Sequence, residues 1–219
     1  LLFSLLFVVN SQYNMMVNLN PGYNYDNVAF FYVDGLKSDQ RAQCLSEIRR
    51  MPDVKMVASC YSVPLQNYGY SGNNLSLSGD KRTLQIIHDA DGVDDNYFKL
   101  MGIKFVEGSF FTERTDSSRQ VIIDENLANK LAKLGHWKDG AVGKRVWISS
   151  HCDENETMTI CGVVKNVKYG TVIMSDTDAK STPFTYFYGH ANNCMLVKFD
   201  DLTENALKNL RDKVQSLYP

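Results

Sequence analysis

The chain has 219 residues, of which 44% are hydrophobic and 22% charged, enough apolar material for a globular core and too little charge bias for disorder. The formal net charge is −2, and no run of lysine and arginine supplies the basic surface that a nucleic-acid phosphate backbone requires. We therefore exclude nucleic acid as a partner.

The first element is an apolar run over residues 1–9 (LLFSLLFVV), which continues with helical spacing through Met15, Met16 and Val17. It is shorter than the roughly 20 residues that span a bilayer, and it lacks the charged flank of a signal peptide. A buried strand or helix is one interpretation. We favour the outer end of a transmembrane or stalk helix over residues 1–19, with its beginning cut off.

Strand and helix signals follow a Pro-, Gly- and Asn-rich loop over residues 20–27. Residues 28–33 (VAFFYV) predict a strand, Ser38 is placed to cap a helix that Pro52 stops, and residues 54–63 predict a second strand. This order fits a βαβ unit with a right-handed crossover.

A related half appears near the end of the chain, where residues 194–199 (CMLVKF) predict a strand and Thr203 caps a helix. The sequence stops at Pro219, before the strand that would complete this second unit, so we expect the native protein to continue. The apolar stripe predicted for the helix consists of Leu207, Leu210, Val214 and Leu217.

A long insertion of different character, residues 66–183, separates the two halves. The fold class predicted is therefore α+β, a split α/β part formed by residues 20–65 and 184–219 and interrupted by a β-rich insertion. The elements predicted in the insertion are a hairpin over 75–88 that turns at Gly79-Asp80, a helix over 97–101 ending at Gly102, a strand over 121–123, a helix that begins at Asp124 and has Gly135 directly after it, and paired strands over 146–149 and 158–164.

Three sequence patterns resemble catalytic motifs without completing one. Residues 140–145 (GAVGKR) lack the glycine spacing and the hydroxyl of a phosphate-binding loop, so they predict a turn, and any ATP hydrolysis must belong to another chain. Residues 69–73 (GYSGN) lack the last glycine of a nucleophile elbow. Residues 78–81 (SGDK) match S-x-x-K but have no K-T-G companion. We expect no catalytic residue and no enzyme.

Acidic and histidine-containing clusters suggest metal sites but do not match known ligand patterns. Residues 89–95 (DADGVDD) would need a glutamate at the twelfth position of a calcium loop, where Leu100 stands. We interpret them as a solvated acidic turn that places Asp94 near a helix N-terminus. Residues 151–154 (HCDE) are consecutive and predict a surface loop. No metal or cofactor is expected.

The five cysteines are widely spaced and form no C-x-x-C pair, and their odd number leaves at least one thiol. Disulfides are allowed outside the cytosol, but we expect buried, reduced side chains. These residues are Cys44, Cys60, Cys152, Cys161 and Cys194.

Aromatic residues in predicted loops are the candidates for a partner surface, because exposed aromatic side chains anchor interfaces. Tyr68 and Tyr70 are the two selected on this ground.

A series of short motifs runs through residues 93–146 in a specific order and spacing. In this order and spacing the chain resembles the MacB-like periplasmic core domain of FtsX-type ABC transporter permeases. Ser109 departs from the arginine usual in that family. The matching residues are Tyr97-Phe98, Gly102-Ile103, Gly108, Phe111, Val121-Ile122, Asp124-Glu125 and Gly143-Lys144, together with Pro21-Gly22-Tyr23, Asn27-Val28 and residues 160–166 (ICGVVKN).

The resemblance implies a non-catalytic domain in the periplasm, tethered to the inner membrane, that passes ATP-driven motion to a partner or to exported substrate. Residues 20–65 and 184–219 would form its porter-like part, residues 66–183 its sabre-like arm, and residues 1–19 the lever. The implied partners are the cytoplasmic ATPase subunit of the same transporter and either a periplasmic adaptor or a second permease copy.

Two other function classes remain open. A membrane-anchored sensory ectodomain would bind a small ligand or peptide in a pocket of convergent polar groups. A secreted hydrolase would bring a serine, a histidine and a carboxylate together in space. Macrolides, peptides, lipoproteins and signals are all cargo of related systems, and the sequence does not select among them.

Overall fold

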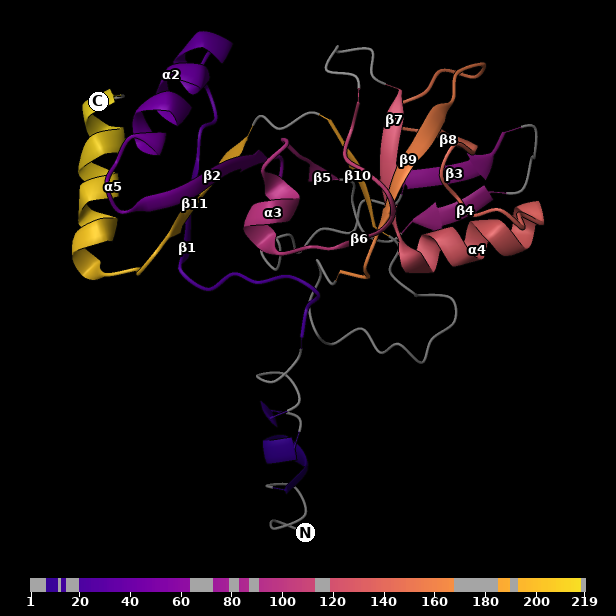
Figure 1. Ribbon diagram of the computed structural model, residues 1–219, viewed down its shortest axis with the longest axis horizontal. Coiled ribbons are helices and arrows are strands. Elements are labelled where there is room, and N and C mark those ends of the chain that lie inside the picture. Colours follow the sequence, from indigo (N-terminus) through magenta and orange to yellow (C-terminus); the bar gives the residue numbers. More distant parts are fainter. Residues whose placement is uncertain are drawn as a thin grey trace.

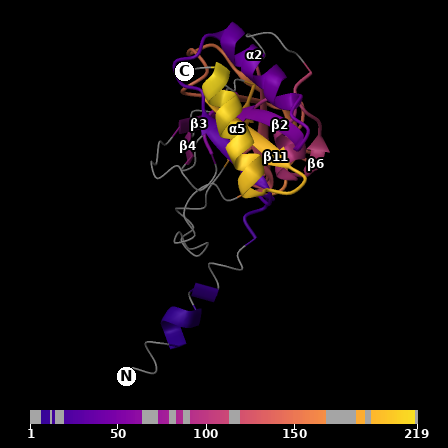
Figure 2. The ribbon, with the colours of Figure 1, turned by 90° about the vertical axis from the view of Figure 1, so that its left-hand side faces the viewer.

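The computed structural model describes residues 7–11, 13–14, 20–63, 73–78, 83–86, 91–112, 119–167, 185–189 and 193–217. Residues 7–11 and 13–14 are helical and extend away from the body of the protein, with Phe7 and Tyr13 exposed (Figures 1 and 2). None of the helices in the described part of the chain has both the length and the apolar character needed to cross a bilayer.

Three strands form the smaller sheet, which we call sheet A, in the order β1-β11-β2. They are β1 (Val28–Tyr32), β11 (Cys194–Phe199) and β2 (Val54–Cys60), and both pairings are antiparallel. The central strand thus comes from near the end of the chain and lies between two strands from its first third. The predicted β-α-β unit is therefore split, with β11 inserted between its two parallel strands.

Two helices, α2 (Ser38–Arg49) and α5 (Glu204–Leu217), cover one face of sheet A (Figure 2). Cys44 and Ile48 of α2 and Leu210 of α5 are buried there against strand residues such as Val197. This apolar layer fixes the helices on the sheet because removing such side chains from water is the main favourable term in folding.

The N-cap residue was predicted correctly for α5 and wrongly for α2. Thr203 caps α5, since its Oγ1 accepts the N–H of Ala206 at 3.1 Å. Ser38 does not cap α2, because the helix already includes it and Lys37 is the N-cap. There the Gln40 side chain accepts the Lys37 N–H at 2.9 Å and takes the capping role.

The stripe predicted for α5 also needs one correction. Leu207 is 39% exposed, and Ala206 is buried in its place. A residue four positions before Leu210 lies on the same helix face, whereas one three positions before it lies at the margin of that face.

The larger sheet, sheet B, has eight strands in the order β4-β3-β8-β9-β7-β10-β5, with β6 paired to β9. The β7–β9 and β10–β5 pairs are parallel, and the others are antiparallel. Its strands are β3 (Asn73–Leu77), β4 (Thr83–Ile86), β5 (Asp91–Gly92), β6 (Phe105–Gly108), β7 (Gln120–Asp124), β8 (Arg145–Ile148), β9 (Met158–Val164) and β10 (Tyr186–Tyr188).

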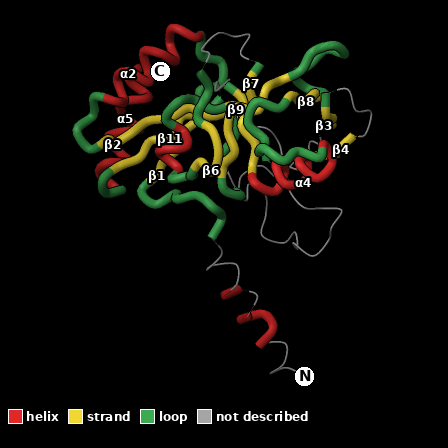
Figure 3. The backbone as a smooth tube through the Cα atoms, turned by 45° about the vertical axis from the view of Figure 1, so that its right-hand side comes forward, coloured by secondary structure: helices red, strands yellow, loops and turns green. Residues whose placement is uncertain are grey.

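Helix α4 (Glu125–Gly135) packs on sheet B through Leu127 and Leu131, as its spacing predicts. It ends one residue later than expected, since His136 takes the left-handed conformation with φ of 54°. A Cβ at Gly135 would lie 2.3 Å from Nε1 of Trp137, so the Trp137 ring would have to shift to admit a larger residue there. The two covering layers thus lie at opposite ends of the molecule, α2 and α5 at one and α4 at the other (Figure 3).

On the second face of sheet A, strands β2 and β11 are buried against sheet B and helix α3 (Tyr97–Met101), whereas Phe30 and Tyr32 of β1 on the same face stay exposed. One apolar cluster joins Cys60 and Leu196 of sheet A to Phe98 of α3 and to Ile122 and Phe187 of sheet B. The two sheets therefore share a continuous core. The predicted mixed α and β fold class is confirmed, whereas the domain limits at residues 65–66 and 183–184 stay a prediction, because residues 64–72 and 168–184 lie outside the described residues.

Candidate functional site: the junction between the two sheets

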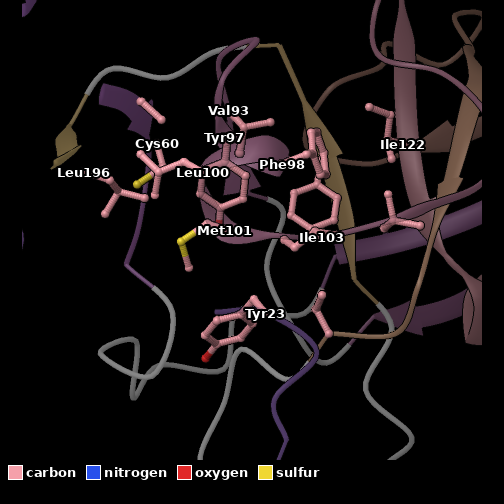
Figure 4. Packing of buried hydrophobic residues seen from close by; sticks show 14 of the residues in the cluster. Tyr23, Cys60, Val93, Tyr97, Phe98, Leu100, Met101, Ile103, Ile122 and Leu196 are labelled. Atoms are coloured by element: carbon pink, nitrogen blue, oxygen red, sulfur yellow. The ribbon is translucent and has the colours of Figure 1, made fainter. Parts of the chain in front are cut away.

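The segment over residues 20–26, which leads from the N-terminal helix to β1, is anchored at the junction of the two sheets. Tyr23 is only 7% exposed and packs in the shared cluster beneath Met101 (Figure 4). Next to it, the Asn24 N–H donates to the Met101 carbonyl at 2.7 Å. The path from the N-terminus thus reaches α3 before it reaches sheet A.

Gly22 brings this segment against sheet B. Its φ is +85°, and a Cβ at this position would lie 2.2 Å from the Asn166 carbonyl oxygen. Only glycine satisfies both the left-handed backbone and this close approach. The Gly22 amide is held by the Asn20 side chain at 2.9 Å, so the turn itself is also closed by a local hydrogen bond.

A second connection joins the junction to the outer edge of β2. The Asp94 carboxylate accepts the N–H groups of Ser59 at 2.9 Å and of Asn96 at 3.0 Å, and the Asp94 N–H donates to the Ser59 carbonyl at 3.1 Å. The Asn96 side chain adds a bond to the Val57 carbonyl at 3.2 Å. The edge strand is thereby paired with a loop of the insertion, which protects its polar groups.

Burial raises the pKa of Asp94, and its two backbone hydrogen bonds oppose that shift. The acidic turn predicted from the sequence is therefore only partly solvated. Asp94 joins the insertion to sheet A through these hydrogen bonds, a role that we call the clamp, whereas Asp95 is exposed.

Replacing Asp94 by alanine leaves two backbone donors without their acceptor, and each unsatisfied buried donor costs about 1–3 kcal/mol. We expect Asp94→Ala to lower the free energy of unfolding by about 2 kcal/mol, measured by urea denaturation. The neighbouring Asp95→Ala variant, on the exposed side of the same loop, should change stability by less than about 0.5 kcal/mol. Equal losses in both variants would contradict the clamp.

Aromatic rings fill the centre of the junction. The centroid of the Phe98 ring lies 4.9 Å from that of Phe187, 5.1 Å from that of Phe105 and 5.8 Å from that of Phe110. The ring centroids of Tyr97 and Phe187 are 6.1 Å apart. These rings come from α3, β6, β10 and the loop after β6. Close packing of this kind transmits a displacement of one element to its neighbours, because interiors have low compressibility.

An open groove of about 730 Å³ lies at the base of the junction, beside the N-terminal segment. Its lining carries two positive and two negative side chains, and one pair is already joined, since Lys165 Nζ lies 3.0 Å from Glu125 Oε1. Among the lining residues that the structure describes, none is serine, cysteine or histidine. The groove is lined by Asn20, Gly22, Tyr23, Asn24, Tyr25, Asp26, Gly102, Lys104, Glu125, Lys165 and Asn166.

Asp124, beside the groove, holds the start of α4. Its buried carboxylate accepts the Leu127 N–H at 2.7 Å and the Thr185 N–H at 3.0 Å. Burial outweighs these bonds and raises the pKa of Asp124 to about 7. The residue is thus an N-cap that ties α4 to the strand before it and to Thr185.

A carboxyl group whose pKa is about 7 when folded and about 3.9 when unfolded favours the folded state at low pH. Its contribution is complete below pH 4 and is lost as the pH rises toward 7. We expect the Asp124→Asn variant to lose this component, so its free energy of unfolding should fall less steeply with pH between 4 and 7. Parallel slopes for the two proteins in urea titrations would contradict the assignment.

The remaining motifs have structural roles. The turn over residues 140–145 binds a carboxylate of the protein itself, since Glu107 accepts the N–H groups of Ala141 and Val142 at 3.3 and 3.1 Å. His151 packs against Tyr188 in a tilted arrangement, with ring centroids 4.4 Å apart. Among the described residues, no group of three histidine, cysteine or acidic side chains could hold a metal ion.

The selected aromatic pair, Tyr68 and Tyr70, lies outside the described residues, as do most of the elbow pattern over 69–73 and the Gly79–Lys81 part of the S-x-x-K pattern. Sequence reasoning missed the burial of Tyr23 and the clamp formed by Asp94. The motif Pro21-Gly22-Tyr23 carried the signal for the first, because an aromatic residue directly after a glycine turn suits a close approach to the core.

Comparison with known proteins agrees with this architecture. A family model described as the MacB-like periplasmic core domain matches residues 3–215, so the chain belongs to that family. A search of curated proteins finds no match.

Three solved structures share the fold at low identity. The periplasmic region of MacB from Actinobacillus actinomycetemcomitans has a TM-score of 0.55 at 16% identity, covering 92% of this chain and 88% of that one. A domain assigned to a permease protein from Porphyromonas gingivalis has a TM-score of 0.52 at 15% identity over 89% and 85%. The extracellular domain of the transporter YknZ from Gram-positive bacteria has a TM-score of 0.51 at 14% identity over 87% and 92%.

The protein is thus a periplasmic domain of the kind found in MacB- and FtsX-like ABC transporter permeases. Such permeases work with ATPase subunits, and the domain type is generally non-catalytic.

Proposed function

We propose that this domain carries motion from ATP-driven membrane helices to a partner or exported substrate outside the membrane. The observation that supports the proposal is the attachment of residues 20–26 to both sheets. Tyr23 lies in the core that the sheets share, and Gly22 lies against the Asn166 carbonyl. A displacement of the N-terminal helix therefore reaches sheet A and sheet B together, through one rigid junction.

The mechanism needs two arrangements of similar free energy, so that the nucleotide state can select one of them. Residues 1–19 act as the lever and the insertion over residues 66–183 as the arm. The dense aromatic core around Phe98 favours movement of the body as a unit, with bending on the N-terminal side of residue 20, where the anchored segment begins.

Electron spin resonance distance measurements on the full-length transporter, with its ATPase subunit in lipid nanodiscs, test this proposal. One label replaces Tyr13 and the other Lys133 on α4, both introduced as unnatural amino acids to avoid the natural cysteines. We expect the distance to change between the nucleotide-free and vanadate-trapped states. The control pair Lys133 and Glu154, both in the sheet B region, should keep its distance. An unchanged distance from position 13 would contradict the proposal.

The partner surface is proposed at Tyr68 and Tyr70 on the inserted arm, and the partner as a periplasmic adaptor or a second permease copy. We expect the double replacement of Tyr68 and Tyr70 by alanine to leave the domain folded and to weaken partner binding by at least tenfold, because aromatic anchors contribute about 2 kcal/mol or more each. Co-purification from cells and circular dichroism measure the two effects. Unchanged binding would exclude this surface.

A sensory ectodomain is the second candidate, and the groove is the observation that favours it, since about 730 Å³ is a ligand-sized volume. Its polar lining fits less well, because ligand pockets are mostly apolar and Lys165 is already paired with Glu125. Thermal-shift screening with amino acids and short peptides tests this alternative. A stabilisation that Lys104→Ala abolishes would support a sensor over a lever.

A further inference from the structure

Two of the five cysteines lie directly opposite each other on neighbouring strands of sheet A. Cys60 is the last residue of β2 and Cys194 the first of β11, and the antiparallel register pairs them directly. Both are 0% exposed and belong to the cluster shared by the two sheets. Directly opposed residues in an antiparallel pair have side chains on the same face of the sheet. All five cysteines are thiols in this structure.

The backbone geometry suits a covalent bond between them. Ser59 directs its N–H and C=O to Asp94, on the outer edge of β2, so the polar groups of the next residue, Cys60, face β11. Residues paired in this way have Cα atoms about 5.5 Å apart, and disulfides span Cα distances of about 4.4–6.8 Å. The Cys194 Sγ now lies 3.8 Å from the Met195 carbonyl, and a change of its χ1 rotamer would turn it away from that oxygen.

The position of the pair in the fold is informative. The chain leaves sheet A for sheet B directly after Cys60, where the Tyr61 N–H bonds the Gly92 carbonyl, and it returns directly before Cys194. Every strand of sheet B lies between the two cysteines in sequence. A bond between them would therefore close a covalent ring that contains the whole inserted arm. The bond would lie where the chain leaves sheet A after Cys60 and returns to it at Cys194.

We propose that Cys60 and Cys194 form a disulfide that holds the end of β2 and the start of β11 together at the base of the inserted arm. In the reaction one thiolate attacks the disulfide of an oxidant, a periplasmic thiol–disulfide oxidoreductase or oxidised glutathione, which releases one thiolate of the oxidant and leaves a mixed disulfide. The second cysteine thiolate then attacks the protein sulfur of that mixed disulfide and releases the other thiolate of the oxidant. The two thiols lose two protons and two electrons, and the oxidant is reduced to two thiols. Because both cysteines are fully buried, the bond forms during folding, before β11 docks on β2.

Two of the other cysteines, Cys44 and Cys161, provide the controls. Cys44 belongs to α2 and is buried between this helix and the opposite face of sheet A, and Cys161 lies on β9 with its Sγ 3.6 Å from the Val121 carbonyl. Burial raises the pKa of both thiols. Neither is paired in register with another cysteine of the described strands.

Peptide mapping tests the proposal on the full-length protein, extracted from cells in denaturant with N-ethylmaleimide to block all thiols. The expected result is a peptide pair joined through Cys60 and Cys194, two hydrogens lighter than the separate peptides, with Cys44 and Cys161 alkylated. The melting temperature should fall by several degrees on reduction, in the Cys44→Ser variant as in the natural protein but not in Cys60→Ser. Alkylation of both Cys60 and Cys194, or pairing of either with another cysteine, would overturn the proposal.

The proposal rests on the extracytoplasmic location of the domain, which a separate measurement checks. An external protease added to spheroplasts should cleave the domain. Cleavage together with alkylated Cys60 and Cys194 overturns the disulfide alone, whereas protection from the protease overturns the location and, with it, the proposed function.

Discussion

Replacing Gly108 by alanine should destabilise the protein by about 4 kcal/mol, close to the whole stability of a marginal domain. Gly108 has φ of +67°, and an added Cβ would lie 2.1 Å from the Cys161 carbonyl oxygen and 3.0 Å from the Gly162 Cα. Both contacts are with backbone atoms of β9, so no side chain can rotate away. Strand β6 would have to separate from β9, with loss of its pairing.

The left-handed backbone alone does not account for this effect. Gly143 has φ of +83° and no atom within 4 Å of an added Cβ, so Gly143→Ala measures the conformational cost alone, about 1–2 kcal/mol. Gly162→Ala is an independent check from the opposite strand, because its Cβ would lie 2.6 Å from the Ser109 carbonyl oxygen. Urea denaturation of the three variants measures the difference, and equal losses for Gly108→Ala and Gly143→Ala would contradict the steric explanation.

These glycines give a physical reason for motifs that carry the family resemblance. Gly108 of β6 and Gly162 of β9 are directly paired. The pairing of β9 with β7 also shifts register here, between Val121 and Ile122 of β7. Two strands approach this closely only where both lack a Cβ. Ser109, where the family usually has arginine, is exposed and takes part through its backbone N–H, which donates to the Cys161 carbonyl at 3.1 Å. That contact is independent of the side chain.

Local signals in the sequence were sufficient for most individual elements. The limits of β9 and β11 agree with the predicted ranges, because both segments are rich in apolar residues, and α4 begins directly after Asp124, where the start of a helix was predicted. The pairing order was not accessible in the same way. The insertion of β11 between β1 and β2 depends on contacts between residues far apart in the sequence, which periodicity does not report.

The candidate site was harder to predict than the fold, for a physical reason. The sequence around Asp94 is as compatible with a solvated turn as with a clamp, and the difference lies in the free backbone groups of Ser59, more than thirty residues earlier. Tyr23 stands among asparagines and other polar residues that predict a loop. Its burial depends on the apolar cluster formed by α3 and both sheets, which exists only after these elements have folded.

Replacing Tyr23 by alanine should uncouple the N-terminal helix from the body of the domain. The side chain is 7% exposed, and deleting a buried aromatic ring costs about 3–5 kcal/mol, so we expect a loss of about 3 kcal/mol in the free energy of unfolding. Tyr25→Ala is the matched control. Its ring lies 6.2 Å from that of Tyr23 but is 56% exposed, and its loss should cost less than about 1 kcal/mol.

The functional consequence separates an anchor from ordinary core packing. In the full transporter, Tyr23→Ala should still permit ATP hydrolysis but should abolish the nucleotide-dependent distance change between positions 13 and 133. Tyr23→Phe keeps the ring in the shared core and should preserve both the stability and the distance change. If Tyr23→Ala does not fold, Tyr23→Leu leaves a smaller apolar side chain and should give a reduced change. A full-sized change in a folded alanine or leucine variant would mean that motion reaches the arm by another route.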